Sequence, residues 1–233
     1  MPGYYYGIDY TYIVFVLPAL IFALWAQFNV KTTFSKYSRV PSDRGMSGYD
    51  AARLILDKNG LYHVRIEQVA GELTDHYDPR DNVIRLSSSV YGARTASAVG
   101  VAAHEAGHAV QYAQNYYPIK LRSAIIPVTN LASKAALPLF VIGIALSFST
   151  LAYVGVILFG ASVVFQLVTL PVEFNASSRA IHALSDSGMS SDGVRAARKV
   201  LTAAALTYVA ALASAIGNFL RLLTIAKRND RDR

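Results

Sequence analysis

Long apolar runs without a charged residue separate the polar parts of this chain. Residues 11–30, TYIVFVLPALIFALWAQFNV, are long enough to cross the hydrocarbon core of a bilayer, and no basic segment precedes them as it would in a cleaved signal peptide. Residues 135–172 are too long for one span; they predict two spans if the first begins near residue 125 and the chain turns at residues 147–150. Residues 200–220, rich in Ala, Ser and Gly, predict a fourth span.

The polar stretch after the first apolar run predicts a small α+β domain. Residues 47–59 have the pattern of a helix with Ser47 as its N-cap and a glycine just past its end. Residues 62–69 alternate like a strand, and residues 72–87, ELTDHYDPRDNVIRLS, predict a β-hairpin that turns at Asp-Pro-Arg-Asp. The apolar pattern that follows predicts one helix over residues 95–114.

Basic residues predict the orientation in the membrane. None precedes the first apolar run, whereas four follow it: Lys31, Lys36, Arg39 and Arg44. The positive-inside rule therefore places the N-terminus outside and the α+β domain in the cytoplasm. Lys134 would lie inside the second span and must reach the interface or a polar cavity. If residues 200–220 span, the basic tail 224–233 ends outside; if they do not, this helix stays with the cytoplasmic domain.

The composition supports a membrane protein. Of the 233 residues 53% are hydrophobic and 16% are charged, against about 25% charged in a soluble domain. The net charge of +7 would suggest nucleic acid in a soluble protein, but here the basic residues flank apolar runs, so we expect no nucleic-acid partner. The predicted parts are an N-terminal transmembrane helix (1–30), a cytoplasmic domain (31–120) that contains the helix 95–114, a transmembrane hairpin (121–172), a further helix and linker (173–199), an Ala-rich helix (200–223) and a basic tail (224–233).

Residues 102–111, AAHEAGHAVQ, contain the spacing H-E-x-x-H. On a helix, His104 and His108 share one face and could bind one metal ion. Glu105 lies beside them, where it could take a proton from a water that zinc activates and pass it to the leaving amine. The alternative is a pair of ordinary core histidines. Burying three unpaired polar groups among Ala, Gly and Val would cost several kcal/mol, and a metal ion removes that cost.

The sequence leaves the third ligand to be chosen. A catalytic zinc usually has three protein ligands, and with no cysteine in the chain the candidates are His63, His76, Glu173 and His182, together with acids scattered along the chain. Glu173 is favoured because it ends an apolar run and because two predicted spans separate it from the histidine pair, which puts both on one side of the membrane. The alternative for Glu173 is an interfacial charge that ends a helix.

Three segments carry a resemblance to a known family. AAHEAGHAVQ, GELTDHYDP and LPVEFNASSRA resemble the putative neutral zinc metallopeptidases of bacterial membranes, over residues 47–223. The resemblance implies a protease with one catalytic Zn²⁺. Together with the apolar runs, it predicts a mainly α membrane protein with three to four transmembrane helices and a small α+β zincin-like cytoplasmic domain.

The site layout is also similar to that of membrane zinc proteases that pair H-E-x-x-H with a later E-[FY]-x-A-D. On that pattern His104, His108 and Glu173 are the zinc ligands and Glu105 is the catalytic base. This chain departs from the pattern at residue 177, where a serine replaces the aspartate that would orient a ligand histidine. Asn175, Ser177 or an acid elsewhere would have to do this instead.

Other polar residues are weaker candidates. His182, Arg179 and Tyr208 could stabilise the transition state, although a surface histidine is the simpler interpretation of His182. The segment LTDHYDP either flanks the cleft or only forms a turn. Residues 82–87, NVIRLS, could hold an extended substrate by strand addition at a sheet edge, or be an ordinary strand.

These features predict a membrane-embedded zinc metalloendopeptidase that hydrolyses peptide bonds at the cytoplasmic surface of a multi-pass bacterial cell membrane. Its partners would be a protein or peptide substrate and the lipid bilayer; the oligomeric state stays open. One alternative is a zinc-binding scaffold without turnover, which the intact Glu105 argues against. Another is an intramembrane protease in which residues 95–114 span, opposed by Arg94, Gln111 and Gln114 near the helix ends. Manganese or iron could also occupy such a site.

Overall fold

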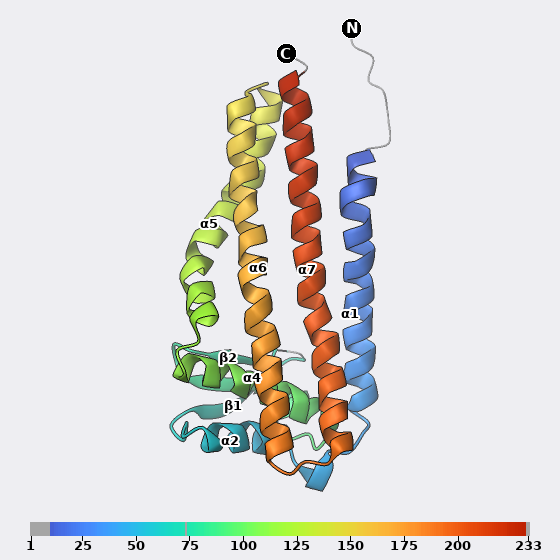
Figure 1. Ribbon diagram of the computed structural model, residues 1–233, viewed down its shortest axis with the longest axis vertical. Coiled ribbons are helices and arrows are strands. Elements are labelled where there is room, and N and C mark those ends of the chain that lie inside the picture. The colour runs from blue at the N-terminus through green and yellow to red at the C-terminus, as the bar shows by residue number, and fades with distance from the viewer. Residues whose placement is uncertain (1–9, 73, 232–233) are drawn as a thin grey trace. The chain divides into compact units, whose positions relative to one another are not determined.

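Helices predominate in the computed structural model, which describes residues 10–72 and 74–231 (Figure 1). In chain order the elements are η1 (Tyr12–Val16, a π-helical turn), α1 (Leu17–Tyr37), η2 (Asp43–Gly45), α2 (Gly48–Lys58), β1 (Arg65–Val69), β2 (His76–Asp78), β3 (Val83–Ser87), α3 (Ser88–Tyr91), α4 (Ala96–Ala113), α5 (Tyr117–Ala145), α6 (Ser149–Asp186) and α7 (Ser191–Arg231). The start of the predicted N-terminal segment (1–9), one hairpin residue (73) and the end of the tail (232–233) lie outside the described residues. The predicted fold class is confirmed.

Four described helices are long and apolar enough to cross a membrane: α1 with its π-helical start, α5, α6 and α7. The chain turns between α5 and α6 where the sequence predicted, with Ser147 in the left-handed region at φ 53°.

Among the described residues α4 does not qualify as a span, which counts against the intramembrane alternative. Lys134 lies within α5 and is exposed on the helix surface, as a lysine that reaches toward an interface would be.

One compact unit comprises the described parts of residues 1–25, 124–167 and 209–233. Its helices approach closely at glycine residues. A Cβ at Gly155 would lie 2.6 Å from the backbone nitrogen of Phe140, and one at Gly217 would overlap the carbonyl oxygen of Phe15. Glycine is therefore required at both contacts.

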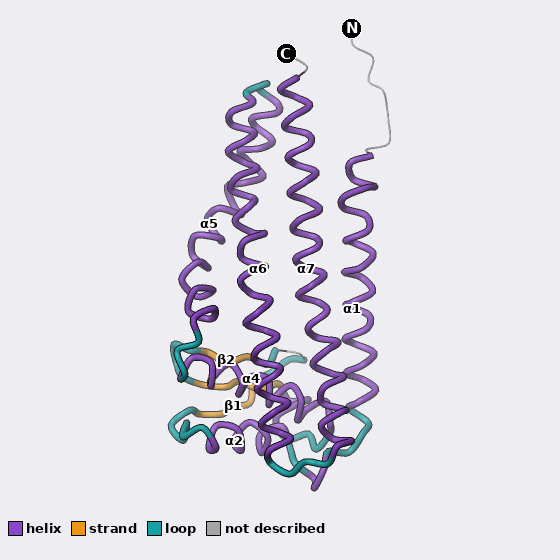
Figure 2. Tube along the Cα trace, viewed as in Figure 1, coloured by secondary structure: helices purple, strands orange, loops and turns teal. Residues whose placement is uncertain are grey.

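The second compact unit, residues 26–123 and 168–208, contains a three-stranded sheet in the order β1-β3-β2. Figure 2 shows the strands in orange beside α2 and α4. β2 and β3 pair antiparallel, which confirms the predicted hairpin, and β1 pairs with β3 in parallel. Because β3 has a neighbour on each side, the hypothesis that NVIRLS binds substrate at a sheet edge is wrong. The parallel partner comes from across a crossover, which the local alternation pattern does not specify.

Helices α2 and α4 form the core of this unit with the sheet. Ser47 and Asp50 make the reciprocal capping box that starts α2, and the Thr95 side chain caps α4. The buried side chains include Leu56, Leu86 and Val99. Thirteen of the 18 residues of α4 are buried, so this helix is held on most sides by protein.

Segments of α6 and α7 complete the same core through Leu184 and Leu201. Gly107 lets α6 approach α4, since a Cβ there would lie 2.6 Å from the carbonyl oxygen of Ala176. This close approach brings a carboxylate of α6 to the histidine face of α4.

Candidate metal centre

His104, His108 and Glu173 lie together in the second compact unit. Glu173 Oε2 is 3.2 Å from His104 Nε2 and 3.5 Å from His108 Nε2, and the three ligand atoms are all within 4.8 Å of one another. On a tetrahedron with metal–ligand bonds near 2.0 Å, neighbouring ligand atoms are about 3.3 Å apart. The separations between the carboxylate and the imidazoles therefore fit a zinc ion, as does the His-His-Glu donor set.

Glu173 comes to this place from inside a long continuous helix. Helix α6 has 38 residues, about 57 Å at 1.5 Å per residue, against a hydrocarbon core of about 30 Å. Its C-terminal part can therefore extend beyond a bilayer. Glu173 lies in that part and is only 2% exposed. A carboxylate buried to this degree needs a partner, and the two imidazoles supply it.

The outer nitrogens of both histidines also have partners. His104 Nδ1 is 3.1 Å from Ser177 Oγ, and His108 Nδ1 is 3.0 Å from Gln111 Oε1. The Gln111 amide is itself fixed, because its Nε2 donates to the carbonyl oxygen of Val172 at 2.8 Å and to Asn175 Oδ1 at 2.9 Å. With Nδ1 engaged in each ring, Nε2 faces Glu173 and is free to bind a metal.

Replacing Gln111 with leucine should lower zinc affinity about 10- to 100-fold, the usual effect of removing a partner behind a ligand histidine. Gln111 is fully buried, and leucine keeps its bulk while leaving His108 Nδ1 unpaired. The measurement is competition for zinc against a chelator. Gln114→Leu, the same change on an exposed residue one turn later, should bind zinc like the wild type. Equal affinities for the two variants would contradict a positioning role for Gln111.

Glu105 points from the same helix toward the sheet. It is 8% exposed, and its Oε2 accepts a hydrogen bond of 2.9 Å from the backbone N–H of Tyr77 on β2. Nearby, the pKa of Asp75 lies above its ordinary value, mainly because this carboxyl is buried. Hydrogen bonds from Ser87 lower the pKa, but the charge of Glu105 raises it further. The segment LTDHYDP therefore both forms the turn and flanks the candidate centre, whereas the sequence left these two interpretations open.

Arg122 and Tyr208 complete the polar surroundings. Arg122 Nη1 is 3.0 Å from Glu173 Oε1, the oxygen that does not face the histidines. The Tyr208 phenol interacts with Glu173, and it also lies within the electrostatic influence of the Glu105 charge. Each carboxylate oxygen of Glu173 thus has its own positively charged or hydrogen-bonding neighbours.

The other candidates have partners of their own. His182 Nδ1 is 2.7 Å from the carbonyl oxygen of Ser178 on the same helix. Arg179 donates to Asn175 Oδ1 at 2.7 Å, on the outer side of the network that holds Gln111. His76 is exposed, with its Nδ1 2.8 Å from the carbonyl oxygen of Thr74, and His63 is exposed in the turn before β1.

Burial lowers the pKa of His108, but its contact with Glu173 and the charge of Glu105 outweigh this and raise the pKa above the ordinary value. A proton on this ring competes with a metal ion for Nε2. Metal binding at this centre therefore requires release of that proton.

Sequence reasoning missed three groups at this centre. Gln111 carried a usable signal, because it lies three residues after His108 and so on the same helix face. Arg122 gave none beyond being a charge at the start of an apolar helix. The backbone N–H of Tyr77 could not be found from side-chain chemistry at all.

Comparisons with known proteins identify the family of this chain. The model of the family described as "putative neutral zinc metallopeptidase" matches residues 12–227. "Putative membrane protease YugP" of Bacillus subtilis (strain 168) is 49% identical over 215 residues, which cover 92% of this chain and 96% of that protein. No solved structure matches the chain. With a family match across nearly its whole length, the chain belongs to the putative neutral zinc metallopeptidases.

Proposed function

We propose that this protein is a membrane-embedded zinc endopeptidase that hydrolyses peptide bonds at the cytoplasmic membrane surface. The observation that carries this proposal is the meeting of His104, His108 and Glu173, from two helices, next to the carboxylate of Glu105. The similarity to a protein named as a membrane protease supports the same reaction class.

In this proposal His104, His108 and Glu173 hold one zinc ion, which when bound acts as a Lewis acid and lowers the pKa of water to about 7. Glu105 takes the proton of the attacking water as the water oxygen bonds to the peptide carbonyl carbon. It returns that proton to the leaving nitrogen as the C–N bond breaks. The hydrogen bond from Tyr77 N–H to Glu105 Oε2 fixes the carboxylate for both transfers.

Tyr208 and Arg122 are our candidates to stabilise the negative charge that develops on the carbonyl oxygen. Tyr208 interacts with Glu173 and is within electrostatic reach of Glu105. Arg122 has a buried Nε–H without a hydrogen-bond partner in the described part of the chain, so one donor remains available. His182 and Arg179 fit this role less well, since their side chains contact Ser178 and the Gln111 network.

The substrate backbone would pair with β2 rather than β3. β2 is an edge strand of the sheet, and Tyr77 places one of its backbone groups against the catalytic carboxylate. An extended peptide added to this edge would run past Glu105. This replaces the hypothesis that NVIRLS binds the substrate.

The cytoplasmic orientation rests on the basic residues that follow the first apolar run. It would place residues 31–120 and the segment 173–199 in the cytoplasm, with 1–30, 121–172 and 200–223 in the membrane. Because the chain has no cysteine, a single cysteine at Lys58 can be labelled by an impermeant maleimide. We expect labelling in inverted vesicles and not in intact cells, with the opposite result for Ser147→Cys. Labelling of Lys58→Cys in intact cells would overturn this orientation.

Metal removal tests the proposed reaction class. The purified full-length protein should cleave an unstructured protein substrate, lose this activity in a zinc chelator and regain it when zinc is added back. The reason is that the imidazoles and carboxylate supply no Lewis acid of their own. Bound metal is quantified in the same samples. Cleavage that persists after the metal has been removed would refute a metallopeptidase.

The alternative of a zinc-binding scaffold shares the same ligands and differs only in turnover. It predicts stoichiometric zinc without cleavage of any substrate. The placement of Glu105 against β2, with a hydrogen bond that orients it, favours the enzyme.

A further inference from the structure

A groove lined by basic side chains lies between α1 and α7, within the second compact unit. Its volume is about 400 Å³. Four of the lining residues are cationic: Lys36 from α1, and Arg195, Arg198 and Lys199 from α7. No acidic side chain lines it in the described part of the chain. Side chains about 160 positions apart in the sequence thus create one positively charged hollow, and none of the candidate metal ligands lines it.

The charges of this groove are largely uncompensated. Arg195 makes an exposed ion pair with Asp192 at 3.3 Å, and Lys36 lies 5.8 Å from the ring of its neighbour Tyr37. Arg198 and Lys199 are exposed and form no ion pair with a described residue. Gathering four like charges in one place is unfavourable unless an anion joins them.

The lining changes in character along both helices. On α1 it passes from Lys36 through Thr33 to Asn29, at the end of the uncharged run 11–30. On α7 it passes from Arg195 through Thr202 to Leu206, inside the apolar run that begins at residue 200. The α7 wall is therefore charged at one end of the groove, hydroxylated in the middle and apolar at the other, while the α1 wall runs from a lysine through a hydroxyl to an amide beside the apolar run. A phospholipid has the same order, with a phosphate, ester oxygens and acyl chains.

We propose that this groove binds an anionic phospholipid, with the phosphate against Lys36, Arg198 and Lys199 and the acyl chains along the apolar end. Basic pockets between membrane helices are suited to such headgroups, and each basic side chain near the surface contributes about 1 kcal/mol. A lipid fits better than a free phosphate because both helices lead from the groove directly into apolar runs long enough to span. The proposal does not depend on the peptidase reaction.

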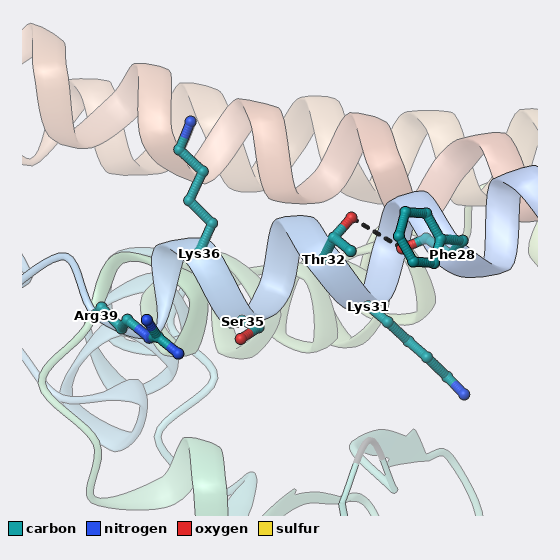
Figure 3. Close-up of a pocket in the computed structure, with 6 residues that line it drawn as sticks. All are labelled: Phe28, Lys31, Thr32, Ser35, Lys36 and Arg39. Atoms are coloured by element: carbon teal, nitrogen blue, oxygen red, sulfur yellow. Dashed lines mark hydrogen bonds between the residues drawn. The ribbon is translucent and has the colours of Figure 1, made fainter.

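The same stretch of α1 offers a matched control. Lys31 and Arg39 line a second hollow along this helix, which Lys36 also borders, and they do not line the groove. Figure 3 shows Lys31 and Lys36 pointing to opposite sides of α1. A general attraction of basic residues to a negative membrane surface would use all of these side chains, whereas a site would use only those in the groove.

The experiment measures lipid binding by native mass spectrometry of the purified full-length protein in a zwitterionic detergent, titrated with phosphatidylglycerol or phosphatidylcholine. We expect the wild type to retain one phosphatidylglycerol in preference to phosphatidylcholine. Arg198→Gln with Lys199→Gln should weaken that binding about 30-fold, from about 1 kcal/mol for each charge and 1.4 kcal/mol for each tenfold change. Lys31→Gln with Arg39→Gln should bind like the wild type.

Three results would overturn the proposal. Equal losses in the two double variants would indicate diffuse surface charge, equal retention of both lipids would indicate no charge recognition, and glycerol phosphate binding as tightly as the lipid would indicate a soluble anion. Helix content and bound zinc report folding of each variant. If the α7 variant is unfolded, the double variant Lys36→Gln with Lys199→Gln replaces it, because it removes one positive charge from each wall of the groove. Wild-type affinity for phosphatidylglycerol in that variant would equally refute the site.

Discussion

Glu105→Gln should keep zinc bound and slow peptide hydrolysis about 10²- to 10⁴-fold, the usual contribution of a general acid–base group. Glutamine has the shape of glutamate and can still accept the hydrogen bond from Tyr77 N–H, so the fold and the ligand set should be unchanged. It cannot take a proton from the attacking water at neutral pH. The measurement is the cleavage rate of an unstructured protein substrate, with zinc content determined on the same sample.

The control for this substitution is Glu67→Gln, the same chemical change on β1, where the carboxylate pairs with Arg65 at 2.7 Å. It should cleave like the wild type. If Glu105→Gln retains full activity, Glu105 is not the base and the proposed mechanism fails. If the wild type holds zinc and cleaves nothing, the scaffold alternative is the better account.

Glu173→Gln is expected to give the opposite pattern, with zinc lost and the fold retained. An amide is a much weaker zinc ligand than a carboxylate, so the loss in affinity should exceed the 10- to 100-fold typical of an outer partner. Glutamine can still accept from Arg122 through its carbonyl oxygen, which avoids leaving that guanidinium without its partner. Zinc affinity is measured by chelator competition, and folding by helix content.

Glu105→Gln serves as the matched control for Glu173→Gln, since both replace a buried carboxylate by its amide near the same histidines. The first should bind zinc normally and the second should not. Normal zinc binding by Glu173→Gln would exclude Glu173 as the third ligand and would leave the histidine pair without the partner proposed here.

Glu173 and Arg122 show which site residues the chemistry of individual side chains can predict from the sequence and which it cannot. Glu173 was favoured because it ends an apolar run and because the predicted spans between it and the histidines are even in number. Arg122 satisfies a similar description, a charge beside an apolar helix, yet nothing in the sequence relates it to Glu173. Its position became clear only from the distance of 3.0 Å between Arg122 Nη1 and Glu173 Oε1.

The missing aspartate at position 177 illustrates the same point. The sequence indicated that some group must orient the ligand histidines and left Asn175, Ser177 and distant acids open. In the structure several side chains share this role, since Ser177 contacts His104, Gln111 contacts His108, and Asn175 supports Gln111. The side chain that faces each ring depends on side-chain rotamers and on the rotation of α6 against α4. Composition and hydrophobic periodicity specify neither of these.

The sequence alone determined the elements whose cause is local. Uncharged runs of about 20 residues specify spans because a bilayer has a fixed thickness, Ser47 and Thr95 start helices because their side chains cap free N–H groups, and positions 104 and 108 share a face because a helix has 3.6 residues per turn. Only the tertiary structure decided the strand order, the edge strand beside Glu105 and the partners of the ligand histidines. The contact of Tyr77 with Glu105 joins residues 28 apart and that of Ser177 with His104 joins residues 73 apart, and the strand order depends on the pairing of β1 with β3. Such contacts are selected by packing of the whole unit rather than by any local pattern.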